Sequence, residues 1–152
     1  MNPDDKELLL QVFSSVLEDF AFMFVEKGSD LELGDQKPCL RAEIEFSNGN
    51  IRGCLKIVAP SDFCDETAQN ILGTDPEDLP KGAGEHALRE MVNIACGFLL
   101  AEKFGTDEIF DLSIPVVETV SKKEWKSLLN DRRYLVLEID ETPCLVGFFF
   151  EN

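Results

Sequence analysis

The sequence predicts an α/β domain of the α+β type, with a mainly antiparallel mixed sheet packed against two long helices. Three patterns predict this class: an amphipathic helix near the start, a hairpin around Asn48-Gly49, and a second long helix after residue 84. With 152 residues, of which 44% are hydrophobic, the chain has the usual size of one domain and can form a proper core. We therefore expect residues 1–152 to form a single domain.

The first helix is predicted from its start signals and its periodicity. Asn2 can cap it, Pro3 suits its first turn, and two Asp residues follow at its positive end. The apolar residues that recur at three- and four-residue steps are Leu8, Leu9, Val12, Phe13, Val16, Leu17, Phe20 and Phe24. They predict a helix that ends near Gly28, and residues 28–38 then predict a polar connection.

The next residues predict a β-hairpin. Asn48-Gly49 is the favoured dipeptide of a two-residue type I′ turn. Folding the chain about this turn places four apolar pairs on one face: Phe46 with Ile51, Ile44 with Gly53, Ala42 with Leu55, and Leu40 with Ile57. The charged residues between them fall on the other face. A slip of one residue would destroy this sorting, so the alternation favours the hairpin.

The remaining elements follow from capping residues, glycines and prolines. Ser61 is expected to cap a short helix that stops at Gly73, and a loop follows over 73–84. Further on we expect a long helix from about Glu85 to Phe104, an extended segment over 109–120 interrupted at Pro115, a short helix opened by the capping box Ser121–Glu124, and strands Tyr134–Ile139 and Cys144–Phe150 around a turn near Thr142-Pro143.

The closing strand is apolar on both of its faces from Leu145 to Phe150. A central strand covered on both sides predicts this pattern, and so does a buried interface between subunits.

Charge and composition exclude several kinds of partner. The formal net charge is −16, so nucleic acid and anionic lipid are poor partners, whereas a basic protein surface fits. No run approaches the ~18–20 apolar residues of a membrane span, and the apolar stretch from Phe20 to Val25 lacks a basic leader. The five cysteines form no CxxC pair, which gives no indication of a zinc or redox site. We expect a cytoplasmic protein with reduced, mostly buried thiols and no metal of its own.

The long helix carries a polar stripe beside its apolar face. Leu88, Met91, Val92, Ala95 and Leu99 form the expected core face, while His86, Glu90, Asn93 and Gly97 form the second stripe. Glu90 and Asn93 are three residues apart, so their side chains project side by side. Asn costs up to ~0.7 and Gly about 0.8–1.0 kcal/mol relative to Ala inside a helix, so stability alone disfavours both.

Two readings of this stripe stay open on the residues alone. It is either a solvated Glu, an Asn bonded to a loop and a Gly that allows internal packing, or a docking surface. In the second case Glu90 would bind a cation, Asn93 would orient a water, and Gly97 would let a partner approach closely.

The Glu90-x-x-Asn93 motif in the middle of a long helix resembles the signature of the CheC/CheX/FliY family of response-regulator phosphatases. The segment Arg52–Pro60, with the short helix that ends at Gly73, is similar to the family's segment before the motif helix, and Leu112–Val117 resembles the stretch behind it. The resemblance covers roughly residues 40–120. It implies a CheC/CheX-like fold and a homodimer formed through the sheets.

The resemblance also implies a function, the dephosphorylation of the aspartyl phosphate of a CheY-like receiver domain. Glu90 would pair with the receiver's Lys and fix the docking, and Asn93 would hold a water in line with phosphorus. Mg²⁺ would belong to the receiver, so the chain would need no cofactor of its own. His86 and Gly97 would contact the partner.

Two departures from the family pattern bear on this prediction. His86 stands where the pattern has Asp or Ser, so its role is open between a general base, a partner contact, a helix cap and an exposed polar residue without a specific task. Glu18 of the first helix is followed three positions on by Ala21, so a second motif copy is missing and one active site is expected. The alternatives to a phosphatase are a catalytically silent receiver-binding module of the same fold and a scaffold.

Overall fold

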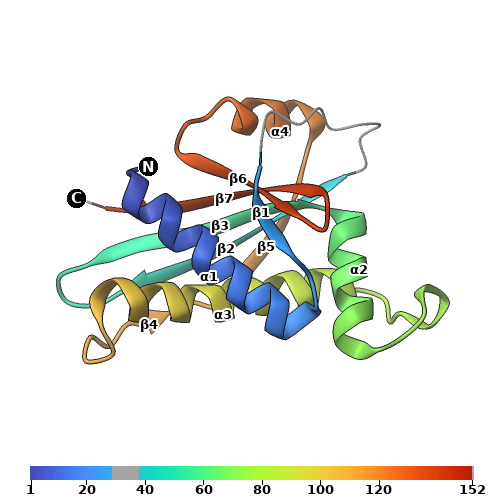
Figure 1. Ribbon diagram of the computed structural model, residues 1–152, viewed down its shortest axis with the longest axis horizontal. Coiled ribbons are helices and arrows are strands. Elements are labelled where there is room, and N and C mark those ends of the chain that lie inside the picture. The colour runs from blue at the N-terminus through green and yellow to red at the C-terminus, as the bar shows by residue number, and fades with distance from the viewer. Residues whose placement is uncertain (29–37, 152) are drawn as a thin grey trace.

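A computed structural model describes residues 1–28 and 38–151 of the chain. The connection predicted at 28–38 lies outside the described residues, apart from its two end residues. In chain order the elements are α1 Pro3–Ala21, β1 Val25–Lys27, β2 Cys39–Ser47, β3 Arg52–Pro60, α2 Ser61–Leu72, the 3₁₀ turn η1 Pro76–Asp78, α3 Ala83–Phe104, β4 Asp111–Leu112, β5 Val116–Val120, α4 Lys122–Leu129, β6 Tyr134–Ile139 and β7 Thr142–Phe150 (Figure 1).

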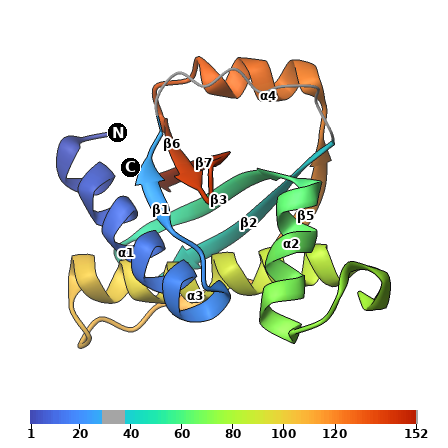
Figure 2. The ribbon, with the colours of Figure 1, turned by 45° about the vertical axis from the view of Figure 1, so that its right-hand side comes forward.

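The described strands form one seven-stranded sheet in the order β1-β6-β7-β3-β2-β4, with β5 also paired to β2. Every pairing among them is antiparallel. α1 and α3 cover one face of the sheet, and α4 lies on the opposite side (Figure 2). The predicted α+β class, with a largely antiparallel sheet against two long helices, is confirmed.

The first helix ends earlier than its periodicity predicts. Phe22 takes the left-handed conformation with φ 58°, and its backbone N–H closes the helix on the carbonyl of Leu17. Strand β1 then occupies part of the span predicted to be helical, and Phe24, expected on the core face, is 72% exposed. The expected start is confirmed, because the Asn2 side chain accepts a hydrogen bond from the Asp5 backbone N–H at 2.7 Å.

The hairpin β2–β3 forms, but the predicted pairing is wrong by two residues. The observed pairs include Phe46 with Gly53, Ile44 with Leu55, Ala42 with Ile57, and Leu40 with Ala59. The Asn48 side chain accepts hydrogen bonds from the backbone N–H groups of Asn50 and Ile51, which moves the turn to Gly49-Asn50. Neither Asn48 nor Gly49 has the positive φ of a type I′ turn. A slip of two residues keeps every side chain on its predicted face.

Two smaller expectations also need correction. The strand turn expected near Thr142-Pro143 lies at Asp140-Glu141, which have φ 46° and 67°, the positive values of a type I′ turn. Ser61 is the first residue of α2 and not its cap, because Pro60 occupies the cap position without a side-chain hydrogen bond. One of the two hydrogen bonds of the predicted capping box of α4 is confirmed. The side-chain oxygen of Ser121 accepts it from the backbone N–H of Glu124 at 3.1 Å.

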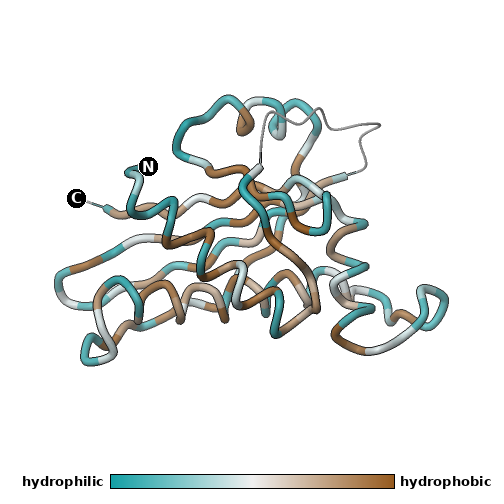
Figure 3. Tube along the Cα trace, viewed as in Figure 1, coloured by the Kyte–Doolittle hydropathy of each residue, from teal (hydrophilic) through white to brown (hydrophobic). Residues whose placement is uncertain are grey.

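The main core lies between the sheet and helices α1, α2 and α3. Alternate residues of the strands point into it, including Ala42, Ile44, Leu55, Ile57 and Val146. Hydrophobic and hydrophilic positions accordingly alternate along the strands (Figure 3). Fixed in this way, α3 turns its apolar side to the sheet and its other side to solvent.

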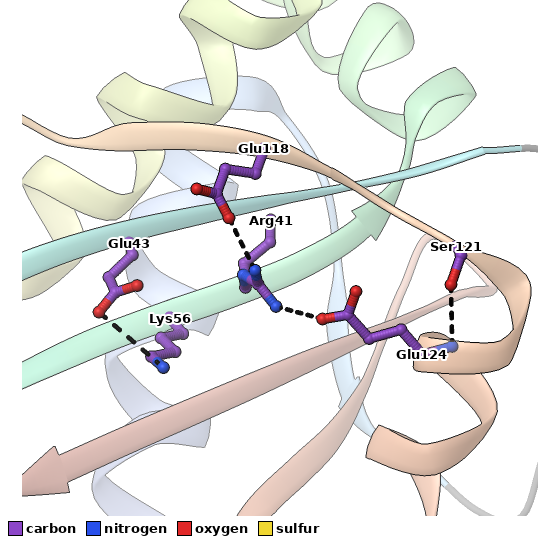
Figure 4. A network of polar contacts seen from close by, with 6 residues as sticks. All are labelled: Arg41, Glu43, Lys56, Glu118, Ser121 and Glu124. Atoms are coloured by element: carbon purple, nitrogen blue, oxygen red, sulfur yellow. Dashed lines mark hydrogen bonds and ion pairs between the residues drawn. The ribbon is translucent and has the colours of Figure 1, made fainter.

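α4 covers part of the opposite face of the sheet. Trp125 is buried there against Cys39, Val58, Val120 and Leu145. Arg41 of β2 donates to Glu118 of β5 at 2.8 Å and to Glu124 of α4 at 2.6 Å, so one guanidinium joins both elements to the sheet (Figure 4). β7 is therefore covered on both faces around Leu145 and Val146, which is the first of the two explanations for its apolar sequence.

Four of the five cysteines are buried, and Cys54 is half-buried. Burial raises the pKa of Cys64 and Cys96 to about 12. These thiols therefore stay protonated near neutral pH and act as small hydrophobic residues. Within the described ranges, no helix is both long and apolar enough to cross a membrane.

Candidate functional site

The candidate site lies on α3, which is held by its apolar side. Gly82, with φ 81°, precedes the helix, and Gly105, with φ 88°, follows it. The buried residues of α3 are Gly84, Ala87, Leu88, Met91, Val92, Ala95, Cys96, Leu99 and Leu100. They include the five residues expected on the core face, so that expectation is confirmed. Packing along the whole helix fixes the direction in which its polar stripe points.

The polar stripe faces outward. His86, Asn93 and Gly97 are exposed, and Glu90 is half-buried. Positions three and four apart on a helix are neighbours, with Cβ atoms roughly 5–6 Å apart. A carboxylate, an amide and a bare stretch of backbone therefore lie in line on an accessible surface, with the imidazole one turn before the carboxylate.

Neither of the two central side chains is committed to an internal contact. Among the described residues, no side-chain hydrogen bond or ion pair of this protein involves Glu90 or Asn93. The reading in which Asn93 is bonded to a loop is therefore wrong for the described part of the chain. Both polar groups remain available to something outside the molecule.

Gly97 has no internal reason to be glycine. A Cβ atom built at Gly97 meets no atom of residues 1–28 and 38–151 within 4 Å, so the internal-packing interpretation is wrong for this part of the chain. Gly84 of the same helix behaves in the opposite way, because a Cβ there would lie 3.1 Å from the backbone nitrogen of Asp65 and against its side chain. Glycine at position 97 therefore destabilises the helix, and no packing contact within the described residues compensates for this cost.

The stripe is bordered by a groove that the sequence analysis did not identify. The groove lies between α1 and α3, has a volume of about 470 Å³, and is lined on its apolar side by Val16, Phe20, Ile94 and Phe98. Ile94 and Phe98 follow Asn93 and Gly97 directly. The signal in the sequence was two apolar residues, four apart, that belong to neither the core face nor the polar stripe.

Metal binding is not indicated at this surface. Over residues 1–28 and 38–151, no group of three or more His, Cys, Asp and Glu side chains is placed to hold a metal ion. What the arrangement can do chemically is to pair a carboxylate with a cation and to position a polar group or water through an amide.

Comparison with known proteins identifies the family. The model of the family described as chemotaxis phosphatase CheX matches residues 42–137, which include Glu90 and Asn93. The chain belongs to the CheX family. The resemblance inferred from the Glu90-x-x-Asn93 motif and its flanking segments is therefore confirmed, and no curated protein sequence matches the chain.

Solved structures share the CheX fold along nearly the whole chain. CheX from Vibrio vulnificus aligns with a TM-score of 0.70 and 18% identity over 95% of each chain. A CheC-like superfamily protein from Shewanella sp. PV-4 aligns with 0.66 and 21% over 100% of each. A complex of CheX with CheY, BeF₃ and Mg²⁺ from Borrelia burgdorferi aligns with 0.61 and 16%, covering 96% of this chain and 97% of the other. At these identities the likeness shows the fold.

Proposed function

We propose that this CheX-family protein is a phosphatase that hydrolyses the aspartyl phosphate of a CheY-like receiver domain. Family membership supports phosphatase activity in general. The single observation that carries the specific proposal is the exposed stripe of α3, on which Glu90 and Asn93 have no internal partner and Gly97 leaves the backbone open. The Borrelia burgdorferi complex, in which a CheX protein is bound to CheY, supports the choice of partner.

The proposed reaction is direct attack of water on phosphorus. The oxygen of water forms a bond to phosphorus, the bond from phosphorus to the aspartyl oxygen breaks, and inorganic phosphate and the free carboxylate leave. The protons of the water remain with the phosphate. Little covalent chemistry is left for the protein, because positioning and charge supply most of the acceleration in phosphoryl transfer.

In this proposal each residue of the stripe has a separate task. Asn93 enters the receiver's site and holds the attacking water in line through its amide. Glu90 pairs with the receiver's Lys and sets the docking position. Gly97 allows close approach of the receiver's backbone, and His86, one turn before Glu90, contacts the receiver at the edge of the interface. The Mg²⁺ ion belongs to the receiver.

The test is the rate at which a phosphorylated CheY-like receiver loses phosphate with and without this protein. We expect faster loss with the wild-type protein, a raised half-saturating receiver concentration for Glu90→Ala, and a lost rate at saturation for Asn93→Ala. The matched control is Asn130→Ala, which changes an exposed amide at the end of α4, on the opposite side of the sheet. If no receiver in a broad panel loses phosphate faster, the proposal is wrong.

The silent receiver-binding module remains the second candidate, favoured by His86 in place of the family's Asp or Ser. It predicts binding of the activated receiver without faster phosphate loss, so the same experiment separates the two. The expected homodimer is also part of the proposal, and sedimentation equilibrium of the full chain tests it.

A further inference from the structure

The groove between α1 and α3 is a partly apolar hollow that adjoins the polar stripe of α3. Val16 and Phe20 come from α1, Ile94 and Phe98 from α3, and Asp19 and Glu102 carry negative charge among its lining residues. Both helices are held by the core beneath them. The groove is therefore a built feature of the helical face and not a gap between mobile segments.

Phe98 does not serve the core. Its side chain is 56% exposed, and it is not among the partly buried residues that pack against the core, whereas Ile94 and Phe20 are. A single exposed apolar residue needs no explanation by itself. Here, however, the exposed ring of Phe98 borders an apolar groove. Covering the ring and the groove together would remove apolar surface from water, which is favourable in free energy.

The position of the groove decides what covers it. Ile94 and Phe98 each follow a member of the polar stripe by one residue. One residue corresponds to a rotation of about 100° around the helix axis. A protein whose active site receives Asn93 lies against this side of α3 and can extend over the adjoining groove. Neither a distant partner nor a small ligand has this geometric reason to occupy it.

We propose that the groove receives an apolar or aromatic side chain of the same receiver domain, with a basic residue of the receiver facing Asp19 and Glu102. This inference rests on the proposed function, and it adds the part of the interface that supplies affinity. Apolar anchors seated in a pocket dominate the binding energy of protein interfaces, while polar stripes around them fix orientation. Phe98 is in this view an affinity-determining residue that takes no part in the reaction itself.

The experiment compares Phe98→Ser with the wild-type protein at a range of phosphorylated-receiver concentrations. We expect the half-saturating receiver concentration to rise about tenfold while the rate at saturation stays unchanged, because the ring binds without touching the reacting atoms. Phe98→Leu should restore the wild-type value to within about threefold, since it keeps an apolar side chain. The matched control is Phe24→Ser, another exposed phenylalanine, which lies outside the groove.

A binding titration with the receiver carrying beryllofluoride, a phosphoryl mimic, separates the two proposals. If Phe98→Ser binds this receiver more weakly but the wild-type protein does not accelerate phosphate loss from any phosphorylated receiver, the groove proposal is supported and the phosphatase proposal is overturned. Accelerated phosphate loss with equal half-saturation for Phe98→Ser and Phe24→Ser overturns the groove alone. A change in sedimentation of Phe98→Ser with unchanged receiver binding assigns the groove to a second copy of the chain, and also overturns the inference.

Discussion

Gly97 provides a test in which stability and activity should move in opposite directions. Gly97→Ala adds a methyl group where no atom of the described part of the chain lies within 4 Å, at a helical position without a positive φ. The helix gains the propensity difference of about 0.8–1.0 kcal/mol, with no steric cost to subtract. For a chain of this length, that gain raises the melting temperature by roughly 2–4 °C.

Gly84→Ala in the same helix is the matched control with the opposite sign. Its methyl group would lie 3.1 Å from the backbone nitrogen of Asp65 and against the Asp65 carboxylate. Crowding of this kind in a packed region costs about 1–3 kcal/mol, which exceeds the propensity gain. The Gly84 variant should therefore unfold at a lower temperature than the wild type.

The assay is thermal and urea unfolding followed by receiver dephosphorylation at 25 °C. Gly97→Ala should be the more stable protein and the poorer phosphatase, with Gly97→Leu poorer still, because each added carbon keeps the receiver further from the helix. A destabilised Gly97→Ala would refute the inference that the space at this position is free. A stabilised variant with undiminished activity would refute the role of the bare backbone in docking.

Two further predictions concern charge and burial. Lys103→Met should lower the free energy of unfolding, measured in urea, by about 1–3 kcal/mol. The reason is that the Asp5 side chain, only 10% exposed, would lose the ammonium group that lies 2.6 Å from its carboxylate. An unchanged urea midpoint would contradict this, and the double variant with Asp5→Asn should recover part of the lost stability. Burial raises the pKa of Cys64 from 9.0 to about 12. As the pH rises, the thiol therefore loses its proton at a lower pH in the unfolded chain than in the folded one. The free energy of unfolding should then fall as the pH rises from 9 towards 12. At pH 10 the protonated, buried Cys64 thiol stabilises the fold by an amount on the order of 1 kcal/mol. The free energy of unfolding of Cys64→Ala should therefore decrease less between pH 8 and pH 10 than that of the wild type, and equal decreases would contradict the prediction.

Local patterns were sufficient for the elements that carry the site. The apolar positions of α3 follow the helical period without interruption, so its core face and its outward stripe were both predictable. The faces of the β2–β3 hairpin were predictable for the same reason, whereas its pairing was not. The Asn48 side chain, through its bonds to the backbone of Asn50 and Ile51, selects a different turn from the one its dipeptide favours.

The features that were missed depend on tertiary contacts. α1 ends at Phe22 in a left-handed conformation that is unfavourable for a bulky residue, so no local signal marks the stop. The groove beside the stripe exists only because α1 packs next to α3, which brings Phe20 to Phe98. The docking of α4 through Arg41 likewise joins residues more than 70 positions apart.

The most direct test of the proposed function is the rate of phosphate loss from a receiver saturated with Asn93→Ala. Saturation removes any effect on binding, so only the positioning of water by the amide is measured. A loss of about 100-fold or more in the accelerated rate, with unchanged unfolding and unchanged binding of the beryllofluoride-loaded receiver, is the predicted result. A variant that dephosphorylates the receiver as fast as the wild type would contradict it.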